Sequence, residues 1–596
     1  MVDNYSWRLD DLYKSDTEFE KKRGEIEAAN YRFINKWRVR KDYLTKPAVL
    51  KEALDEYDFI LRNYGTDGDE GYYYWLRSQL DQTDPEIKAK VNKIEDFSNR
   101  IQNDIQFFYL NICKIPKRLQ QSFLSYKGLR PYRHFLERAF RESRYLLSDK
   151  EERVINLKNA PAYSYWIRMT SSFLSKEERL VLNDKGEKEK KTFAEIMALI
   201  NHKKKPIRDR AAEALNDILR CNVDISECEL NSILQNKKVD DELRKVPRPD
   251  LPRHISDDID SHIVDTLIET VAEGFQLSAR YYKLKAKLLG VKRLKYHERN
   301  VEYGNIDRKY PFKDSVRLVN KVLRDLDSEF SDILETFLRE GRFDVLPRKG
   351  KVSGAFCAHH LITQPTYILL NHNERFDDVL TLAHELGHGI NNELIKRRQR
   401  AINFGTPLST AEVASTFMED FVLKEIIKDA DDHTRLAIMM KKLNDDVSTI
   451  FRQVACYRFE QELHSSFRQS GYLSKDKVGE IFQRHMASYM GDYVEQSEGS
   501  QNWWVYWGHI RTFFYVYSYA SGLIISKSLQ QAVQEDRAYI SKVKDFLSAG
   551  LSESPRALFK GLGIDIESKA FWQKGMHEVE TLLNDTETLA KRLRLI

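Results

Sequence analysis

The stretch Thr381-Leu382-Ala383-His384-Glu385-Leu386-Gly387-His388 carries two histidines four residues apart, with a glutamate between them. On a helix, residues i and i+4 lie on one face, one turn apart, so both imidazoles can reach one metal ion. Glu385 would lie beside them as a candidate proton acceptor. The alternative is a wet surface helix, but the apolar residues ahead of His384 indicate a buried one. Buried polar side chains need partners, and a metal ion provides them.

A catalytic metal of this kind needs a third protein ligand. Position 394 is Leu394, which excludes the class whose third ligand is a histidine six residues after the second. The other solution is a glutamate on a following helix, which we expect to start at Ser409 or Thr410. Glu412 lies in its first turn and Glu419 on the same face. Glu412 would alternatively complete a capping box, and Glu419 would either orient a ligand histidine or be a surface charge.

Most of the remaining chain has the apolar spacing of amphipathic helices, for example over 16–40, 47–64 and 84–110. A turn signal at 183–186 predicts a small hairpin or loop over 178–193, before a helix from Thr192. Ser148 begins an S-x-x-E pattern typical of a helix start.

Residues 351–371 are rich in Val, Ile, Thr, Tyr and Phe and predict two short strands with a turn at Gln364-Pro365. Asp377 or Asp378 would cap the helix that follows. These patterns predict a mainly α fold with a small β-sheet beside the metal helix. We place a boundary near residue 200, between an N-terminal helical lobe (1–200) and a catalytic domain (201–596).

Composition excludes several classes of protein. The net charge is +5 over 596 residues, which argues against a nucleic-acid or membrane-surface partner. Five scattered cysteines without C-x-x-C spacing indicate reduced thiols. Residues 1–14 are polar and do not resemble a secretory signal, and no apolar run approaches the roughly 18 residues of a membrane helix. We therefore expect a cytoplasmic protein.

The sequence HELGH, then a loop with Pro407, then Ala411–Glu419 (AEVASTFME), resembles the thimet-oligopeptidase superfamily and is most similar to its oligoendopeptidase F branch. The resemblance extends to Ser6–Tyr13, to Gly354–Cys357 and to Gly491–Gly522, so it covers nearly the whole chain in order. One departure is Asn391, where relatives usually carry a histidine that is not a zinc ligand.

The resemblance implies that His384, His388 and Glu412 bind one zinc ion and that Glu385 is the general base. It also implies transition-state donors in the later segment. Alternating tyrosines are by themselves more typical of packing, and Tyr519 is assigned to packing. The donors implied are His509, Tyr517 and Tyr515.

The family further implies two helical lobes around a deep channel. The expected activity is zinc-dependent hydrolysis of internal bonds in short unfolded peptides. A peptide would pair with the strand at Gly354, Ala355 and Phe356. His359 and His360 are candidates for substrate contact, with a loop or core role as the alternative. The competing functions are a metallocarboxypeptidase with the same motif and a peptide-binding scaffold that has lost catalysis.

Overall fold

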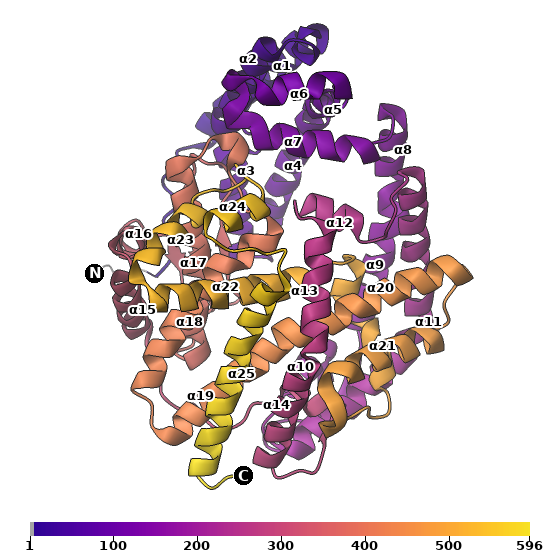
Figure 1. The fold of residues 1–596 in the computed structure, drawn as a ribbon, viewed down its shortest axis with the longest axis vertical. Coiled ribbons are helices and arrows are strands. Elements are labelled where there is room, and N and C mark those ends of the chain that lie inside the picture. Colours follow the sequence, from indigo (N-terminus) through magenta and orange to yellow (C-terminus); the bar gives the residue numbers. More distant parts are fainter. Residues whose placement is uncertain (1–4) are drawn as a thin grey trace. The chain divides into compact units, whose positions relative to one another are not determined.

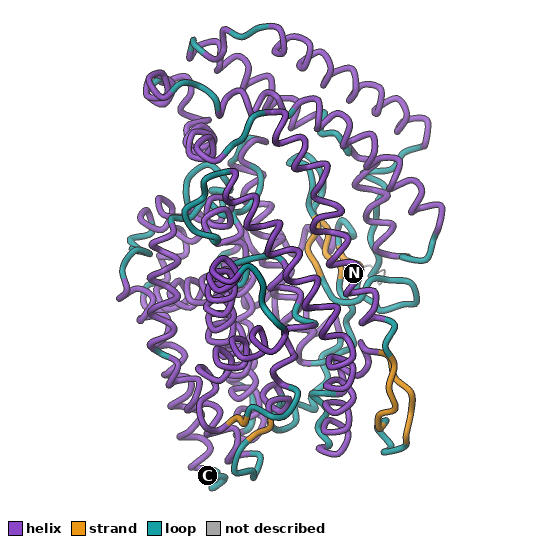
Figure 2. The backbone as a smooth tube through the Cα atoms, turned by 90° about the vertical axis from the view of Figure 1, so that its right-hand side faces the viewer, coloured by secondary structure: helices purple, strands orange, loops and turns teal. Residues whose placement is uncertain are grey.

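The computed structural model describes residues 5–596; Met1–Asn4, the start of the polar N-terminal stretch, lie outside the described residues. The fold is mainly α, as predicted, and the strands are few and short (Figures 1 and 2). The chain forms two compact units, each made of three chain segments. The first comprises 1–144, 307–428 and 529–564, and the second comprises 145–306, 429–528 and 565–596. The linear boundary near residue 200 stays a prediction.

The first unit contains the helix with the metal motif. Its α-helices are α1 (Asp16–Val39), α2 (Pro47–Asn63), α3 (Gly68–Leu80), α4 (Pro85–Ile105), α5 (Phe107–Cys113), α6 (Lys117–Ser125), α7 (Arg133–Glu142), α15 (Phe312–Leu326), α16 (Ser328–Arg339), α17 (Phe376–Arg398), α18 (Leu408–Lys428), α23 (Ile540–Leu547) and α24 (Pro555–Gly561). The periodicity over 16–40, 47–64 and 84–110 is therefore confirmed as helix.

A three-stranded sheet lies against α17, in the order β4 (Phe343–Asp344), β6 (Tyr367–Leu369), β5 (Phe356–Ala358). The antiparallel pair β5–β6, with Cys357 opposite Ile368, confirms the two predicted strands. The sequence did not indicate β4, which is only two residues long and pairs with β6 in parallel. The N-terminal segment fixes the sheet, because the Trp7 indole N–H donates to the Ile368 carbonyl at 2.9 Å. β5 is left at the edge.

The start of α17 differs from the prediction. The helix begins at Phe376 with Arg375 as its N-cap residue, so neither Asp377 nor Asp378 is the cap. Asp378 acts from the third helical position, where its carboxylate accepts the N–H of Arg375 at 2.8 Å.

Gly387 lets α17 and α18 pack closely together. A Cβ atom at this position would lie 2.7 Å from the carbonyl oxygen of Ala414 and 2.7 Å from the Cα of Ser415. Both atoms are backbone atoms, so no side-chain movement would relieve the contact. The glycine inside the motif therefore sets the distance at which a residue of α18 faces the two histidines of α17.

The second unit holds the predicted hairpin, which the structure confirms as β1 (Glu178–Leu182) paired antiparallel with β2 (Lys188–Thr192). Ser148 and Glu151 form the predicted capping box. A second pair, β3 (Leu294–Lys295) with β7 (Val494–Glu495), is parallel. The helices are α8 (Asp149–Asn159), α9 (Tyr165–Ser175), α10 (Phe193–Leu199), α11 (Lys205–Leu243), α12 (Leu251–Ser256), α13 (Ser261–Glu273), α14 (Phe275–Leu288), α19 (Asp432–Asp446), α20 (Arg452–Ser470), α21 (Lys475–Met490) and α25 (Lys569–Arg592), with α22 (Tyr517–Glu535) beginning in this unit.

Across residues 5–596, no helix has both the length and the apolar character needed to cross a membrane. All five cysteines are free thiols.

Candidate metal centre

Three side chains from α17 and α18 converge in the first unit. The ligand atoms of His384, His388 and Glu412 all lie within 4.8 Å of one another. The Glu412 Oε2 atom is 3.4 Å from His384 Nε2 and 3.7 Å from His388 Nε2. Two imidazole nitrogens and one carboxylate oxygen therefore face a common point, with a donor set that suits zinc. The alternative role of Glu412 in a capping box does not apply. Helix α18 already begins at Leu408, so Ser409 is not its N-cap residue, and the Glu412 carboxylate faces the two histidines.

Two further side chains hold these ligands. Glu419, two turns after Glu412 on α18, places its Oε2 atom 3.1 Å from the Nδ1 atom of His384. This contact directs the Nε2 atom of His384 toward Glu412, and a carboxylate behind a histidine is the usual support of a metal-ligating imidazole. The hydroxyl of Ser415 donates to Oε2 of Glu412 at 3.0 Å. Neither contact involves the Nε2 atoms of His384 and His388, which face the common point.

The electrostatics of the cluster fit a cation. Burial alone would lower the pKa of His384, but hydrogen bonds to Glu412 and Glu419 raise that pKa to about 10. Burial and the neighbouring His384 lower the pKa of His388 to about 4, so this imidazole is neutral and has a lone pair to offer. Burial opposes ionisation of Glu412, yet the two histidines bring its pKa down to about 2. The residues present thus fit a divalent metal.

Glu385 lies on the same helix with its side chain almost enclosed, at 8% exposure. Burial raises the pKa of its carboxyl to about 7, while His384 and the backbone N–H of Cys357 favour the ionised form. A carboxyl group that titrates near neutral pH can both accept and return a proton, as a general base requires. Cys357 belongs to the edge strand β5, which packs against α17.

Comparison with known proteins identifies the family. The model of peptidase family M3 matches residues 201–578, and that of oligopeptidase F matches residues 111–178. The chain belongs to peptidase family M3. It is 24% identical to an oligoendopeptidase F homolog of Lactococcus lactis, with 99% of this chain and 98% of that protein aligned. It is 23% identical to oligopeptidase PepF of Bacillus subtilis, with 99% and 88% aligned.

The fold agrees with solved structures. The oligoendopeptidase-F structure from Enterococcus faecium superposes with a TM-score of 0.71 at 18% identity, covering 97% of this chain and all of that one. PZ peptidase A superposes with a TM-score of 0.73 at 15% identity, covering 97% and 99%. These likenesses concern the fold. Membership of family M3 implies peptidase activity for this chain.

The residues predicted as donors lie in the second unit. The rings of His509 and Tyr515 are nearly parallel, with centroids 6.1 Å apart. The indole N–H of Trp507 donates to His509 Nδ1 at 3.0 Å, so a neutral His509 carries its proton on Nε2. That Nε2 atom lies 3.1 Å from the hydroxyl of Tyr519. His509, Tyr515 and Tyr519 are all partly exposed.

The structure argues against the donor role predicted for Tyr517. Its side chain has no exposed surface, and its hydroxyl donates to the buried carboxylate of Asp257 at 2.7 Å. Tyr519, which the sequence assigned to packing, is the tyrosine that reaches His509. The alternation of tyrosines does not reveal this difference, because Asp257 is 260 residues away in the chain.

The predicted peptide-binding strand is only partly available. Gly354 and Ala355 line a cavity of about 280 Å³ together with Thr381, one turn before His384. Gly354 has a φ of +88°, which favours glycine. The Phe356 ring instead packs on Trp7 and Trp75, with centroids 6.2 and 5.5 Å away. The Phe356 side chain is therefore engaged in packing within the protein, and its backbone pairs with Leu369 of β6.

Asn391 has a structural role. Its Nδ2 donates to the carbonyl of Leu547 at 2.5 Å, and its Oδ1 accepts the hydroxyl of Thr406 at 3.1 Å. It therefore joins α17 to the loop before α18 and to the end of α23, and it does not contact the histidines through any of these bonds.

The structure also reveals residues that the sequence did not indicate. Phe513 and Phe514 both have positive φ, +47° and +57°, a strained conformation for bulky residues. The N–H of Phe514 donates to the buried carboxylate of Glu460 at 2.6 Å, and the His464 ring packs on Phe514 at 4.7 Å. These contacts hold the turn between His509 and Tyr515. No local pattern links α20 to this turn.

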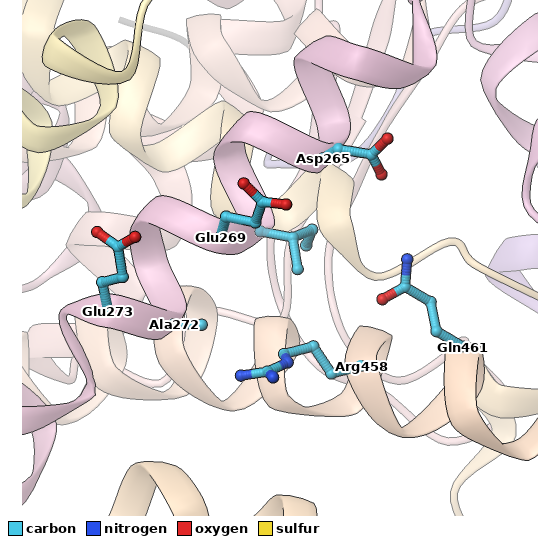
Figure 3. A pocket seen from close by; sticks show the side chains of 7 residues that line it. Asp265, Glu269, Ala272, Glu273, Arg458 and Gln461 are labelled. Atoms are coloured by element: carbon cyan, nitrogen blue, oxygen red, sulfur yellow. The ribbon is translucent and has the colours of Figure 1, made fainter.

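A separate cavity of about 470 Å³ lies between α13 and α20 in the second unit (Figure 3). It is rich in carboxylates, but Asp265 is paired with Arg248 at 2.7 Å and Glu273 with Lys569 at 2.6 Å. None of the predicted site residues lines it.

Proposed function

We propose that this chain is a zinc-dependent oligoendopeptidase that hydrolyses internal bonds of short, unfolded peptides. The observation that supports this most directly is the convergence of His384, His388 and Glu412, with Glu385 beside them and Glu419 behind. The reaction class follows from the family, and the metal follows from the fit of this donor set.

When bound, zinc would supply Lewis-acid activation of a water molecule and of the scissile carbonyl. His384, His388 and Glu412 would hold it, and Glu419 would keep the Nε2 atom of His384 aimed at it. Glu385 accepts a proton from the attacking water and returns it to the leaving amine, so no covalent intermediate with the protein forms. Because Glu385 is largely buried, the pKa of its carboxyl is raised to about 7, so the group can both accept and return a proton near neutral pH.

The donor roles implied for His509 and Tyr515 stay predictions, and the hydroxyl of Tyr519 joins them in place of Tyr517. A donor to a developing oxyanion is worth about 10²–10³ in kcat. The donor role of His509 requires a neutral imidazole with its proton on Nε2, and the hydrogen bond that Trp507 donates to Nδ1 supports that tautomer.

The test is Glu385→Gln, assayed on an internally quenched peptide of about ten residues while bound zinc is measured by metal analysis. We expect zinc to remain and turnover to fall below detection. Glu393→Gln is the matched control, since Glu393 lies two turns farther along α17 and pairs with Lys396. Turnover in Glu385→Gln with zinc bound would overturn the mechanism.

The competing carboxypeptidase function is distinguished by the products. An endopeptidase cuts the same internal bond when the C-terminal carboxylate of the peptide is amidated. A carboxypeptidase loses its activity on that peptide. An inactive scaffold would bind the peptide and cut neither form.

A further inference from the structure

A recess in the first unit lies beside the metal helix. It has a volume of about 200 Å³ and is formed by α3, α4 and the residues that follow β5. Its walls include the aromatic side chains of Tyr72 and Trp75 and the aliphatic side chain of Ile94. Two carboxylates, Asp67 and Glu95, also line it. We call it the Trp75 recess.

The lining of the Trp75 recess combines apolar walls with negative charge. None of its nine lining residues is a lysine or an arginine. Asp67 has a partner, His360, whose Nε2 is 3.2 Å from its carboxylate. Glu95 is exposed and, within residues 5–596, has no hydrogen-bond or ion-pair partner. The recess therefore contains one carboxylate that no cation of the described chain neutralises.

Trp75 gives the recess a fixed aromatic surface. Its ring is held by an edge-to-face contact with Phe356 of β5, with centroids 5.5 Å apart, and it still remains 39% exposed. An exposed indole that is held in place by packing is the preferred surface for the aliphatic stem and the charge of a cationic side chain. Trp75 and Glu95 together match the two ends of such a side chain.

Two independent measures place the recess close to the metal centre. His359 lines it, and His359 Nδ1 is 3.0 Å from the side-chain amide of Asn392, one helical turn after His388. One turn is about 5.4 Å along the helix. Along the chain, His359 directly follows β5, and β5 packs against α17. A peptide lying along β5 with its scissile bond at Glu385 would thus place a nearby side chain at the recess.

We propose that the Trp75 recess is a subsite that receives a lysine or arginine side chain of the peptide substrate, close to the bond that is cut. Its aromatic and aliphatic walls contact the stem of that side chain, and Glu95, with Asp67 beside it, faces the charge. This proposal rests on the proposed peptidase function and adds a preference for basic residues to it.

The experiment uses three internally quenched peptides that differ only in having arginine, norleucine or glutamate at one position, with that position moved along the peptide in separate sets. At the position that reaches the recess, we expect kcat/KM of the wild-type enzyme to be about tenfold higher for arginine than for norleucine. Glu95→Gln should lower this ratio at least about threefold, and Glu95→Lys should favour the glutamate peptide.

Asp96→Asn is the matched control, because Asp96 is the next residue on α4, is also exposed and does not line the recess. It removes the same charge from the same helix and should leave the ratio unchanged. The arginine preference should also shrink as sodium chloride rises from about 0.05 to about 0.5 M, since added salt screens exposed charges.

The outcomes separate the two proposals. Hydrolysis of all three peptides with the same arginine-to-norleucine ratio in wild type, Glu95→Gln and Glu95→Lys would overturn the subsite and leave the peptidase function standing. If wild type cuts none of the peptides, the proposed function fails, and calorimetric binding of the arginine and norleucine peptides tests the subsite alone. Equal dissociation constants in that measurement would overturn it as well.

Discussion

Replacing Glu419 by alanine should weaken metal binding without removing a metal ligand. In the structure the Glu419 carboxylate lies 3.1 Å from Nδ1 of His384 and makes the contact that orients the other nitrogen of that ring. Loss of such a support typically costs about 10–100-fold in metal affinity. The two side chains are 28% and 25% exposed, so solvent screens the pair. We therefore expect the lower end, about tenfold, or about 1.4 kcal/mol.

The measurement is the zinc dissociation constant, obtained by competition with a chromophoric chelator at fixed pH. Glu425→Gln is the control, since it removes a carboxylate from the same helix that pairs with Lys321 and Lys428 instead. Glu412→Ala should lose far more affinity than Glu419→Ala, because it removes a proposed ligand. An affinity in Glu419→Ala within twofold of wild type would refute the orienting role of Glu419.

Three further predictions concern other parts of the chain. Gly387→Ala should destabilise the protein by about 1–3 kcal/mol, because the added methyl group forces α17 away from α18. Gly24→Ala in α1 should instead stabilise it by about 0.5–1 kcal/mol, because an added Cβ there meets nothing within 4 Å. Thermal melting of the two variants and the wild type measures both effects. Burial raises the pKa of the Glu460 carboxyl to about 8. In the unfolded chain the same group loses its proton near pH 4.3. The contribution of the protonated group to the free energy of unfolding is therefore lost as pH rises from the unfolded pKa to the folded pKa. Denaturant unfolding should therefore show that the free energy of unfolding falls less between pH 5.5 and pH 8 in Glu460→Gln than in wild type. Tyr519→Phe should lower kcat by about 10²–10³, and Tyr517→Phe should act mainly on stability; the reverse order in steady-state kinetics would restore the donor role to Tyr517.

The sequence was sufficient wherever the determining contacts are local. The spacing of His384 and His388 specifies one helix face, and the turn at 183–186 specifies the hairpin that the structure confirms. Ser148 and Glu151 form their capping box across three residues. In each case a short stretch contains both partners, so the pattern and the structure describe the same interaction.

The sequence failed where the partner is distant. Tyr517 and Tyr519 belong to the same alternating stretch, but the Tyr517 hydroxyl donates to the distant Asp257, whereas the Tyr519 hydroxyl contacts His509. Asn391 looked like a change near the metal, but its partners are Leu547 and Thr406, so it fastens a loop. The start of α17 was misplaced because Arg375 is an unusual N-cap residue and Asp378 acts from inside the helix.

The most direct test of the metal centre is an anomalous difference map recorded at the zinc absorption edge, from crystals of the protein prepared with one equivalent of zinc. We expect one strong peak between Nε2 of His384, Nε2 of His388 and Oε2 of Glu412, at about 2.0–2.2 Å from each. Glu412→Ala crystals prepared in the same way should lose it. A peak at another site, or a peak that survives in Glu412→Ala, would contradict the assignment of these three residues as the zinc ligands.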